Sequence, residues 1–357
     1  MPGVSDRFRG LLLGTAIGDS LGLPAEGLSP RRARRMFPGR WRHRLLPATG
    51  WISDDTDHAV FVAQSLLAHP ESARRFVRRL AWCLRLWLLS LPAGIGLGTL
   101  RATSRLWIGI PPAHSGVRSA GNGPAMRSAP IGAFFATQPE HIERYVAAST
   151  RLTHVDPRAL TGARAVALLA AWCIREELNA APEPARFLQV LRDAGDDPEW
   201  RGKLDALSDA VSSNLAVAEF AASLGLTAGI TGYVYHTVPV VAYAWYRHFG
   251  NFEQTLTAVL DCGGDADTTG AIAGALAGAV VGEQGIPANW LRGFRDFPRG
   301  KPLLRDIADR LAASRRGTGG RSSMRPVRYL WLALVPRNLI LLLVVLLHGL
   351  RRLLPPY

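Results

Sequence analysis

Cysteine is scarce in this sequence: Cys83, Cys173 and Cys262 are the only three among 357 residues. Their odd number and wide spacing exclude a disulfide scaffold and a cysteine-rich zinc site, and they favour a reducing compartment. Charged residues are also few, at 20%, beside 48% hydrophobic residues. That balance excludes intrinsic disorder of the whole chain, and the length suffices for a core that needs no covalent staple.

Signal-peptide and strand patterns are missing as well. Asp19 interrupts the apolar run that includes Leu11-Leu12-Leu13, and no cleavage-type site follows, so we expect no signal peptide and a cytoplasmic body. Runs of alternating strands and a βαβ rhythm are not found. Apolar residues instead recur at three- and four-residue intervals in 142–150, 160–177 and 203–224. This spacing predicts an all-α fold, with a single compact multi-helix domain over residues 1–312.

Acidic residues are absent after residue 312. Residues 313–357 contain eight arginines and no aspartate or glutamate, so this segment carries more than half of the net charge of +14. Because the excess belongs to a separate part of the chain, it is poor support for nucleic-acid binding by the body. We therefore predict no specific nucleic-acid partner.

The C-terminal segment divides into two parts. Residues 313–328 predict a basic flexible linker, and residues 329–357 a hydrophobic tail. In the tail, the apolar blocks 329–335 and 339–347 are separated by Pro336-Arg337-Asn338, and the apolar residues favour membrane insertion while the arginine opposes it. We predict membrane association through residues 329–350, as one bent span or a segment in the interface. More arginines precede the tail than follow it, which places the body on the inner face of the membrane. A helix docked on the body or on a partner is the alternative.

Glycine recurs every fourth residue in two stretches, at Gly10, Gly14, Gly18 and Gly22, and at Gly270, Gly274, Gly278 and Gly282. Each glycine costs a helix about 1 kcal/mol relative to alanine, so four on one face imply a compensating contact. We expect two buried central helices whose backbones approach closely and which pack on each other. The alternative is a compositional bias toward alanine and glycine.

Carboxylates are concentrated in two short stretches, Ser53-Asp54-Asp55-Thr56-Asp57 and Asp265-Ala266-Asp267-Thr268-Thr269, each followed by an apolar helical run. Helix capping accounts for one acid at each site. Adjacent like charges repel unless a cation lies between them, and carboxylate and hydroxyl oxygens suit Mg²⁺ or Mn²⁺. The pair of stretches therefore favours metal binding over capping alone. A phosphatase site around Asp265 and Asp267 is disfavoured because Cys262-Gly263-Gly264 precedes it instead of a hydrophobic strand.

Six segments together resemble the ADP-ribosylglycohydrolase family, in the order that the family has them across residues 6–312. The segments are 6–26 with Gly18-Asp19-Ser20-Leu21-Gly22, Ser53-Asp54-Asp55-Thr56, Gly121-Asn122-Gly123-Pro124-Ala125-Met126-Arg127, Leu152-Thr153-His154, Thr231-Gly232-Tyr233-Val234, and 263–270. The tail lies outside the resemblance. Ser53 stands where threonine is usual, and Thr269 where a larger apolar residue is common.

The resemblance implies an all-helical domain with a centre of two Mg²⁺ or Mn²⁺ ions. The implied metal ligands are Ser53, Asp54, Asp55, Asp265, Asp267 and Thr268, and the implied catalytic residues are Glu26, Asp54 and Asp267. The implied substrate-binding residues are Ser119, Gly121, Asn122, Gly123 and His154. Glycine in such a loop lets backbone N–H groups approach a diphosphate.

The sequence thus predicts a metal-dependent hydrolase that cleaves the glycosidic bond of ADP-ribose on a modified protein side chain or a small ADP-ribose conjugate. Carboxylates can stabilise the oxocarbenium-like charge that develops in this reaction. Two alternatives remain open, a catalytically inactive ADP-ribose-binding or structural member of the fold and a membrane-bound adaptor acting through its tail. The acceptor is expected to be selected at the mouth of the site, by residues 111–118 and 233–236.

Overall fold

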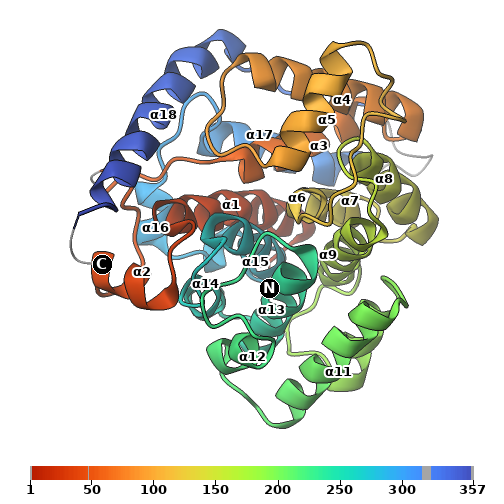
Figure 1. Cartoon of the computed structure of the whole chain (residues 1–357). Helices are drawn as coiled ribbons and strands as arrows, with labels where there is room; N and C mark the ends of the chain where they lie inside the picture. The colour runs from red at the N-terminus through yellow and green to blue at the C-terminus, as the bar shows by residue number, and fades with distance from the viewer. Residues whose placement is uncertain (1, 47, 316–322, 355–357) are drawn as a thin grey trace.

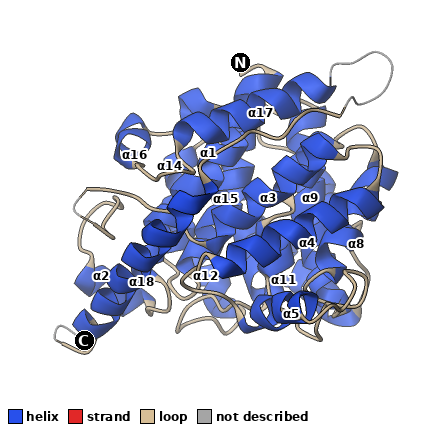
Figure 2. Cartoon of the chain, turned by 90° about the horizontal axis from the view of Figure 1, so that it is seen from above, coloured by secondary structure: helices blue, strands red, loops and turns tan. Residues whose placement is uncertain are grey.

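The computed structural model describes all of the chain except residues 1, 47, 316–322 and 355–357. Its described residues form eighteen α-helices and no β-strand, which confirms the all-α prediction (Figure 2). The helices are α1 Val4–Gly22, α2 Pro30–Met36, α3 Asp54–Ala68, α4 Ala73–Leu89, α5 Leu97–Trp107, α6 Gly123–Met126, α7 Ala129–Phe134, α8 Pro139–Arg151, α9 Pro157–Arg175, α10 Pro184–Arg192, α11 Pro198–Ser212, α12 Val217–Ser223, α13 Val234–Arg247, α14 Phe252–Leu260, α15 Ala266–Val281, α16 Ala288–Gly293, α17 Lys301–Arg315 and α18 Leu334–Arg351.

The two glycine-rich helices, α1 and α15, lie near the middle of the molecule and pack on each other (Figure 1). A Cβ atom on Gly14 would lie 2.1 Å from the carbonyl oxygen of Gly274, and one on Gly18 would lie 1.9 Å from that of Gly270. Such distances mean that the two backbones are in direct contact, which confirms the predicted close approach of the two helices.

The antiparallel register of this helix pair decides where the acids meet. Gly10 lies against Gly278, and Gly22, at the other end of α1, lies against Ala266, the first residue of α15. The C-terminal end of α1 is therefore beside the N-terminal end of α15. Glu26 follows shortly after α1, and Asp265 and Asp267 begin α15, so the packing brings these acids to one end of the helix pair.

Loops complete this end of the molecule. Gly264, before α15, forms isolated β-bridges with Leu28 on one side and with Ile230 on the other, and its N–H donates to the carbonyl of Leu28 at 2.7 Å. Its φ is +81° and an added Cβ would lie 2.0 Å from the carbonyl oxygen of Ile230, so a side chain is excluded there. The loops after α1, before α13 and before α15 are thereby held together.

The C-terminal segment lies along the body. Helix α17 continues through the expected boundary at residue 312 to Arg315, and residues 316–322 of the predicted linker lie outside the described part of the chain. From Ser323 the chain follows α3, where the backbone N–H of Met324 donates to the carbonyl of Leu67 at 2.8 Å. Helix α18 then runs along the edge of the body (Figures 1 and 2). Pro336 falls in the first turn of α18, where proline is tolerated, so one helix carries the second apolar block of the predicted hydrophobic tail.

Candidate active site

A groove of about 640 Å³ opens where the end of α1 meets the first turns of α3 and α15. Ten of the twelve residues singled out from the sequence line it: Glu26, Asp54, Ser119, Gly121, Asn122, Gly123, His154, Asp265, Asp267 and Thr268. The other two, Ser53 and Asp55, are buried directly beside it. The fold therefore gathers residues that are up to 242 positions apart in the chain into one place.

Helix capping occupies only one side chain of the first acidic stretch. Ser53 is the N-cap of α3, and its Oγ accepts from the backbone N–H of Asp55 at 3.2 Å. Asp54 and Asp55 belong to the first turn of α3, where the helix dipole favours negative charge. The capping alternative thus explains the serine and leaves both carboxylates available for another role.

Hydrogen bonds connect the two acidic stretches to each other and to the glycine-rich loop. The hydroxyl of Thr268 donates to Oδ2 of Asp55 at 3.3 Å, and the hydroxyl of Ser53 donates to the same oxygen at 3.1 Å. Asp265, at the N-cap position of α15, accepts instead from the side-chain amide of Asn122 at 2.6 Å. Three segments that are remote in sequence therefore form one polar network.

The electrostatics of this network are those of crowded, buried acids. Burial raises the pKa of Asp54, Asp55 and Asp267 well above the ordinary value, and repulsion from neighbouring carboxylates raises it further. Burial and the nearby Asp265 likewise raise the pKa of Glu26. Oδ1 of Asp55 is buried without a hydrogen-bond partner among the described residues. Such a cluster is unfavourable as it stands and would be stabilised by a cation.

We expect the Asn122→Asp variant to be destabilised at pH 7 in the presence of EDTA. The new carboxylate would replace a donor 2.6 Å from Oδ2 of Asp265, which costs about 1–3 kcal/mol. Thermal unfolding measures the difference. The matched control is Asn251→Asp at the N-cap of α14, where either residue caps well. Equal melting temperatures for the two variants at pH 7 would contradict the assigned contact.

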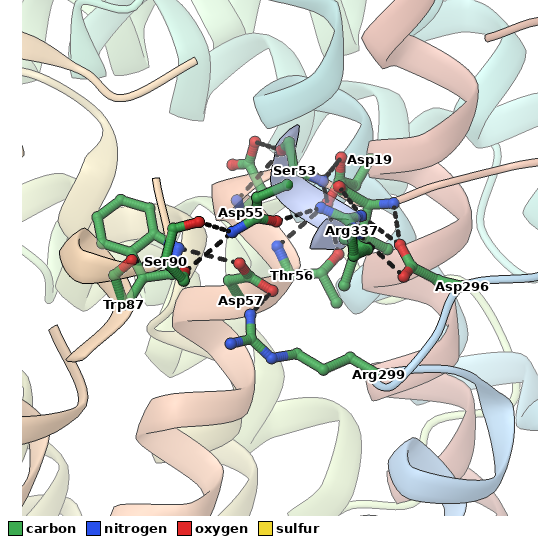
Figure 3. A network of polar contacts seen from close by, with 12 residues as sticks. Asp19, Ser53, Asp55, Thr56, Asp57, Trp87, Ser90, Asp296, Arg299 and Arg337 are labelled. Carbon is green, nitrogen blue, oxygen red and sulfur yellow. Dashed lines mark hydrogen bonds and ion pairs between the residues drawn. The ribbon is translucent and has the colours of Figure 1, made fainter. Parts of the chain in front are cut away.

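Not every acid of the first stretch faces the groove. Asp57 is buried behind it, where it accepts from the indole N–H of Trp87 at 3.0 Å and forms an ion pair with Arg299 (Figure 3). This acid holds α3 against the segment that precedes α17. Its role is structural, and its position in the run of acids did not distinguish it from Asp54 and Asp55.

Asp19 belongs to the hydrogen-bond network of the site, although it is not among the twelve site residues expected from the sequence. It lies in the last turns of α1, and its carboxylate accepts from the backbone N–H of Ser53 at 3.0 Å and from the hydroxyl of Thr56 at 2.5 Å (Figure 3). Burial raises the pKa of Asp19 to about 7. Asp19 ties the end of α1 to the start of α3. The signal that could have found it is an acid within an otherwise apolar, glycine-rich helix.

His154 presents an uncharged ring at the groove. Burial, followed by the nearby Arg127, lowers the pKa of His154 to about 3. Arg127 donates to the hydroxyl of Thr153 at 2.6 Å, and that hydroxyl lies 2.9 Å from Nδ1 of His154. This arrangement favours a hydroxyl that donates to Nδ1, which leaves the ring proton on Nε2. The neutral ring can then donate a hydrogen bond toward a ligand.

The walls of the groove differ from the expectation. The expected segments 111–118 and 233–236 are not among the described residues that line it, and its outer walls come from segments around 94–99 and 228–232.

The tail also reaches this end of the molecule. Arg352 donates to the backbone carbonyls of Pro24 and Glu26, both at 2.8 Å. Nothing in the sequence around Arg352 indicated this contact.

Comparisons with known proteins agree on one family. The family model described as ADP-ribosylglycohydrolase matches residues 1–321. An uncharacterized protein of Archaeoglobus fulgidus is 31% identical, with 86% of this chain and 96% of that protein covered. The ADP-ribosyl-[dinitrogen reductase] glycohydrolase of Rhodospirillum rubrum is 32% identical, with 81% of this chain and 90% of that enzyme covered.

A vertebrate relative and a solved structure extend these likenesses. The ADP-ribosylhydrolase ARH3 of Xenopus tropicalis is 29% identical, with 82% of this chain and 93% of that protein covered. A solved structure described as an ADP-ribosylglycohydrolase-related protein complex superimposes with a TM-score of 0.66 at 28% identity, covering 88% of this chain and 100% of that one. The similarity thus extends over most of each chain.

Proposed function

Because the chain belongs to the ADP-ribosylglycohydrolase family, we propose that it is a hydrolase that uses two Mg²⁺ or Mn²⁺ ions to cleave the glycosidic bond of ADP-ribose on a modified protein side chain or a small ADP-ribose conjugate. The family indicates a glycohydrolase; the metal dependence and the substrate are the proposal. One observation carries it. The two acid–hydroxyl stretches meet at a single groove, joined by the hydrogen bond from Thr268 to Asp55.

The residues present fit a pair of hard divalent cations. We assign Ser53, Asp54, Asp55, Asp265, Asp267 and Thr268 as their ligands, a set of carboxylate and hydroxyl oxygens. The orphaned Oδ1 of Asp55 and the raised pKa values of its neighbours support this assignment. Within the described part of the chain, no three His, Cys, Asp or Glu side chains are already grouped closely enough to hold an ion. We therefore expect carboxylate rotation to accompany binding.

The chain's own side chains would bind and orient the substrate. We assign Ser119, Gly121, Asn122, Gly123 and His154 to the ADP-ribose moiety, because they all line the groove. Gly123 has no side chain to keep a diphosphate away from its backbone N–H, whereas the N–H of Gly121 donates to the hydroxyl of Ser119 at 3.3 Å. The Nε2 proton of His154 adds a donor without adding charge. These donors suit an anionic ligand. Such a ligand can lie beside the cluster of acids if a cation neutralises the acids.

The chemical step is assigned to acids that line the same groove. Cleavage at the anomeric carbon develops positive charge on the ribose, which the carboxylates of Glu26, Asp54 and Asp267 can stabilise. Glu26 reaches the groove from the loop after α1. We assign its carboxylate to accept a proton from the attacking water. When bound, divalent ions supply Lewis-acid stabilisation and a water that ionises near neutral pH.

The test is hydrolysis by the purified full-length chain of a panel of conjugates linked through arginine, serine and acetate. We expect release of free ADP-ribose from at least one conjugate with Mg²⁺ or Mn²⁺, and a loss of at least 100-fold in EDTA that added metal restores. Binding of ADP-ribose without release from any conjugate would favour the inactive, ligand-binding alternative. Turnover that is unchanged in EDTA would overturn the metal assignment.

The location is also part of the proposal. We place the body in the cytoplasm, held by its tail at the inner face of a membrane. Support comes from the three cysteines, all free, and from residues 331–351, which have a mean hydropathy of 2.0 over 18 residues and are only 22% buried. Removal of the tail would then change the location of the enzyme but not its hydrolysis of the substrate, which the body carries out.

A further inference from the structure

Helix α18 has two faces of opposite character. The face toward the body carries polar groups among apolar ones: Arg337 and Asn338 are buried, and His348 lies 2.9 Å from the carbonyl of Leu45. The outward face consists of leucine and isoleucine. Leu343, Leu346 and Leu350 are 57%, 57% and 61% exposed, and their spacing places them on one side of the helix. A docked helix of a soluble body normally has the reverse arrangement.

Docking of the polar face is specific. Arg337 donates to the carbonyl of Ile52 at 2.6 Å and forms an ion pair with Asp296, a contact visible beside Ser53 and Asp19 (Figure 3). The side-chain amide of Asn338 donates to the carbonyl of Ser90 at 2.8 Å. A helix that spanned a bilayer would have to break these bonds and carry Arg337 away from its partners. The docked helix therefore lies parallel to the surface of the body.

Basic residues border the apolar face. Arg351 is exposed at the C-terminal end of α18, and the side chain of Arg32 in α2 donates to the carbonyl of Arg352. Helix α2 thus adjoins this end, and it adds the exposed Arg31, Arg34 and Arg35. Residues 323–354 contain no acid. Leucines on one side and arginines at the margin are the composition of a helix that lies in a membrane interface.

We propose that the outward face of α18 binds the surface of an anionic bilayer while its inward face stays docked on the body, so that the chain associates with one leaflet and does not span. This inference rests on the location proposed above and defines its mode. A second copy of the chain is a poorer occupant, because it would bring the same arginines together across the apolar contact. An anionic lipid surface complements both the leucines and the arginines.

The experiment is co-sedimentation of the full-length chain with vesicles of phosphatidylcholine alone or mixed with phosphatidylserine. We expect binding to the mixed vesicles, at least tenfold weaker binding to neutral ones, and release in alkaline carbonate. Leu343→Ser combined with Leu346→Ser should reduce binding at least tenfold. The matched control, Leu86→Ser combined with Ile108→Ser, changes two exposed apolar residues of α4 and the segment after α5 and should bind as the unaltered chain does.

Other outcomes would overturn the proposal. Resistance to carbonate with equal binding to neutral vesicles would show insertion across the bilayer. A dimer in solution that the Leu343→Ser/Leu346→Ser pair dissociates, without vesicle binding, would show that a second copy covers the face. Hydrolysis of a soluble conjugate by the same variants is measured in parallel, so a failure of membrane binding and a failure of the proposed activity are separate results.

Discussion

The Asp55→Asn variant is expected to lose at least 100-fold in hydrolysis and yet, without divalent ions, to be more stable than the unaltered chain. The loss of activity follows because Asp55 is assigned as a metal ligand, and removing metal-based stabilisation of the transition state costs several kcal/mol, about tenfold in rate for each 1.4 kcal/mol. The gain in stability follows because Asp55 is buried among Asp54, Asp19 and Asp265, which repel its charge. An amide keeps the shape and removes the repulsion.

The stability of the metal-free protein should also depend on pH, because raising the pH places the unfavourable charge on Asp55. Folding raises the pKa of Asp55 above the ordinary value of 3.8, so the folded chain binds its proton more tightly than the unfolded chain does. This group's contribution is fully present below about pH 4 and is lost as the pH rises through the folded value. Unfolding in EDTA should therefore show a chain that becomes less stable from pH 5 to pH 7, and the Asp55→Asn variant should lose less over that range.

Two other aspartate-to-asparagine substitutions serve as controls. Asp196→Asn removes an exposed charge on the body and should change neither activity nor stability by more than about 0.5 kcal/mol. Asp57→Asn should destabilise by about 3–5 kcal/mol with or without metal, because it leaves Arg299 buried without its ion-pair partner. Added Mn²⁺ should raise the melting temperature of the unaltered chain more than that of Asp55→Asn. An equal rise in both proteins would contradict the assignment of Asp55 as a ligand.

The second large effect is expected at the contact between α1 and α15. Gly14→Ala would place a Cβ atom 2.1 Å from the carbonyl oxygen of Gly274. The opposing atom is backbone, so no side-chain rotation relieves the clash and the helices must move apart. Overpacking of a core costs typically 1–3 kcal/mol, and here we expect about 3 kcal/mol or more, measured by denaturant unfolding.

The control for this substitution is Gly202→Ala in α11. An added Cβ there meets no atom within 4 Å, so the same change should stabilise the chain by about 0.5–1 kcal/mol through helix propensity. The two variants then differ in sign for one chemical change. If Gly14→Ala unfolded at the same denaturant concentration as Gly202→Ala, the close approach of α1 and α15 would be wrong.

Much of the architecture was readable in the sequence because local patterns encode it. Four-residue glycine spacing has few explanations in a helix other than close backbone contact, so the pairing of the two glycine-rich helices could be predicted. Adjacent acids beside hydroxyls could likewise be expected to lie together, and both stretches do reach one groove. The register that pairs Gly14 with Gly274 could not be predicted, because every four-residue shift of either helix satisfies the same spacing.

The remaining features depend on contacts between residues remote in sequence. Asp57 belongs to the same run of acids as Asp54, and only the position of Arg299 assigns it to the interior. Arg337 was interpreted as an obstacle to membrane insertion, whereas its partners Asp296 and Ile52 make it a docking group. In both cases the sequence shows the charge but not the partner that determines its role.

The contact between α1 and α15 also limits how the groove can move. Two backbones at this separation cannot slide past one another, because a carbonyl of one would meet a Cα atom of the other. The acids at the shared end of the two helices are therefore held in fixed positions. Any closure over a ligand would have to come from the walls, at 94–99 and 228–232, where Gly94 and Gly229 already adopt positive φ. Hydrogen exchange should accordingly respond to ligand in those two loops and stay unchanged along the paired helices.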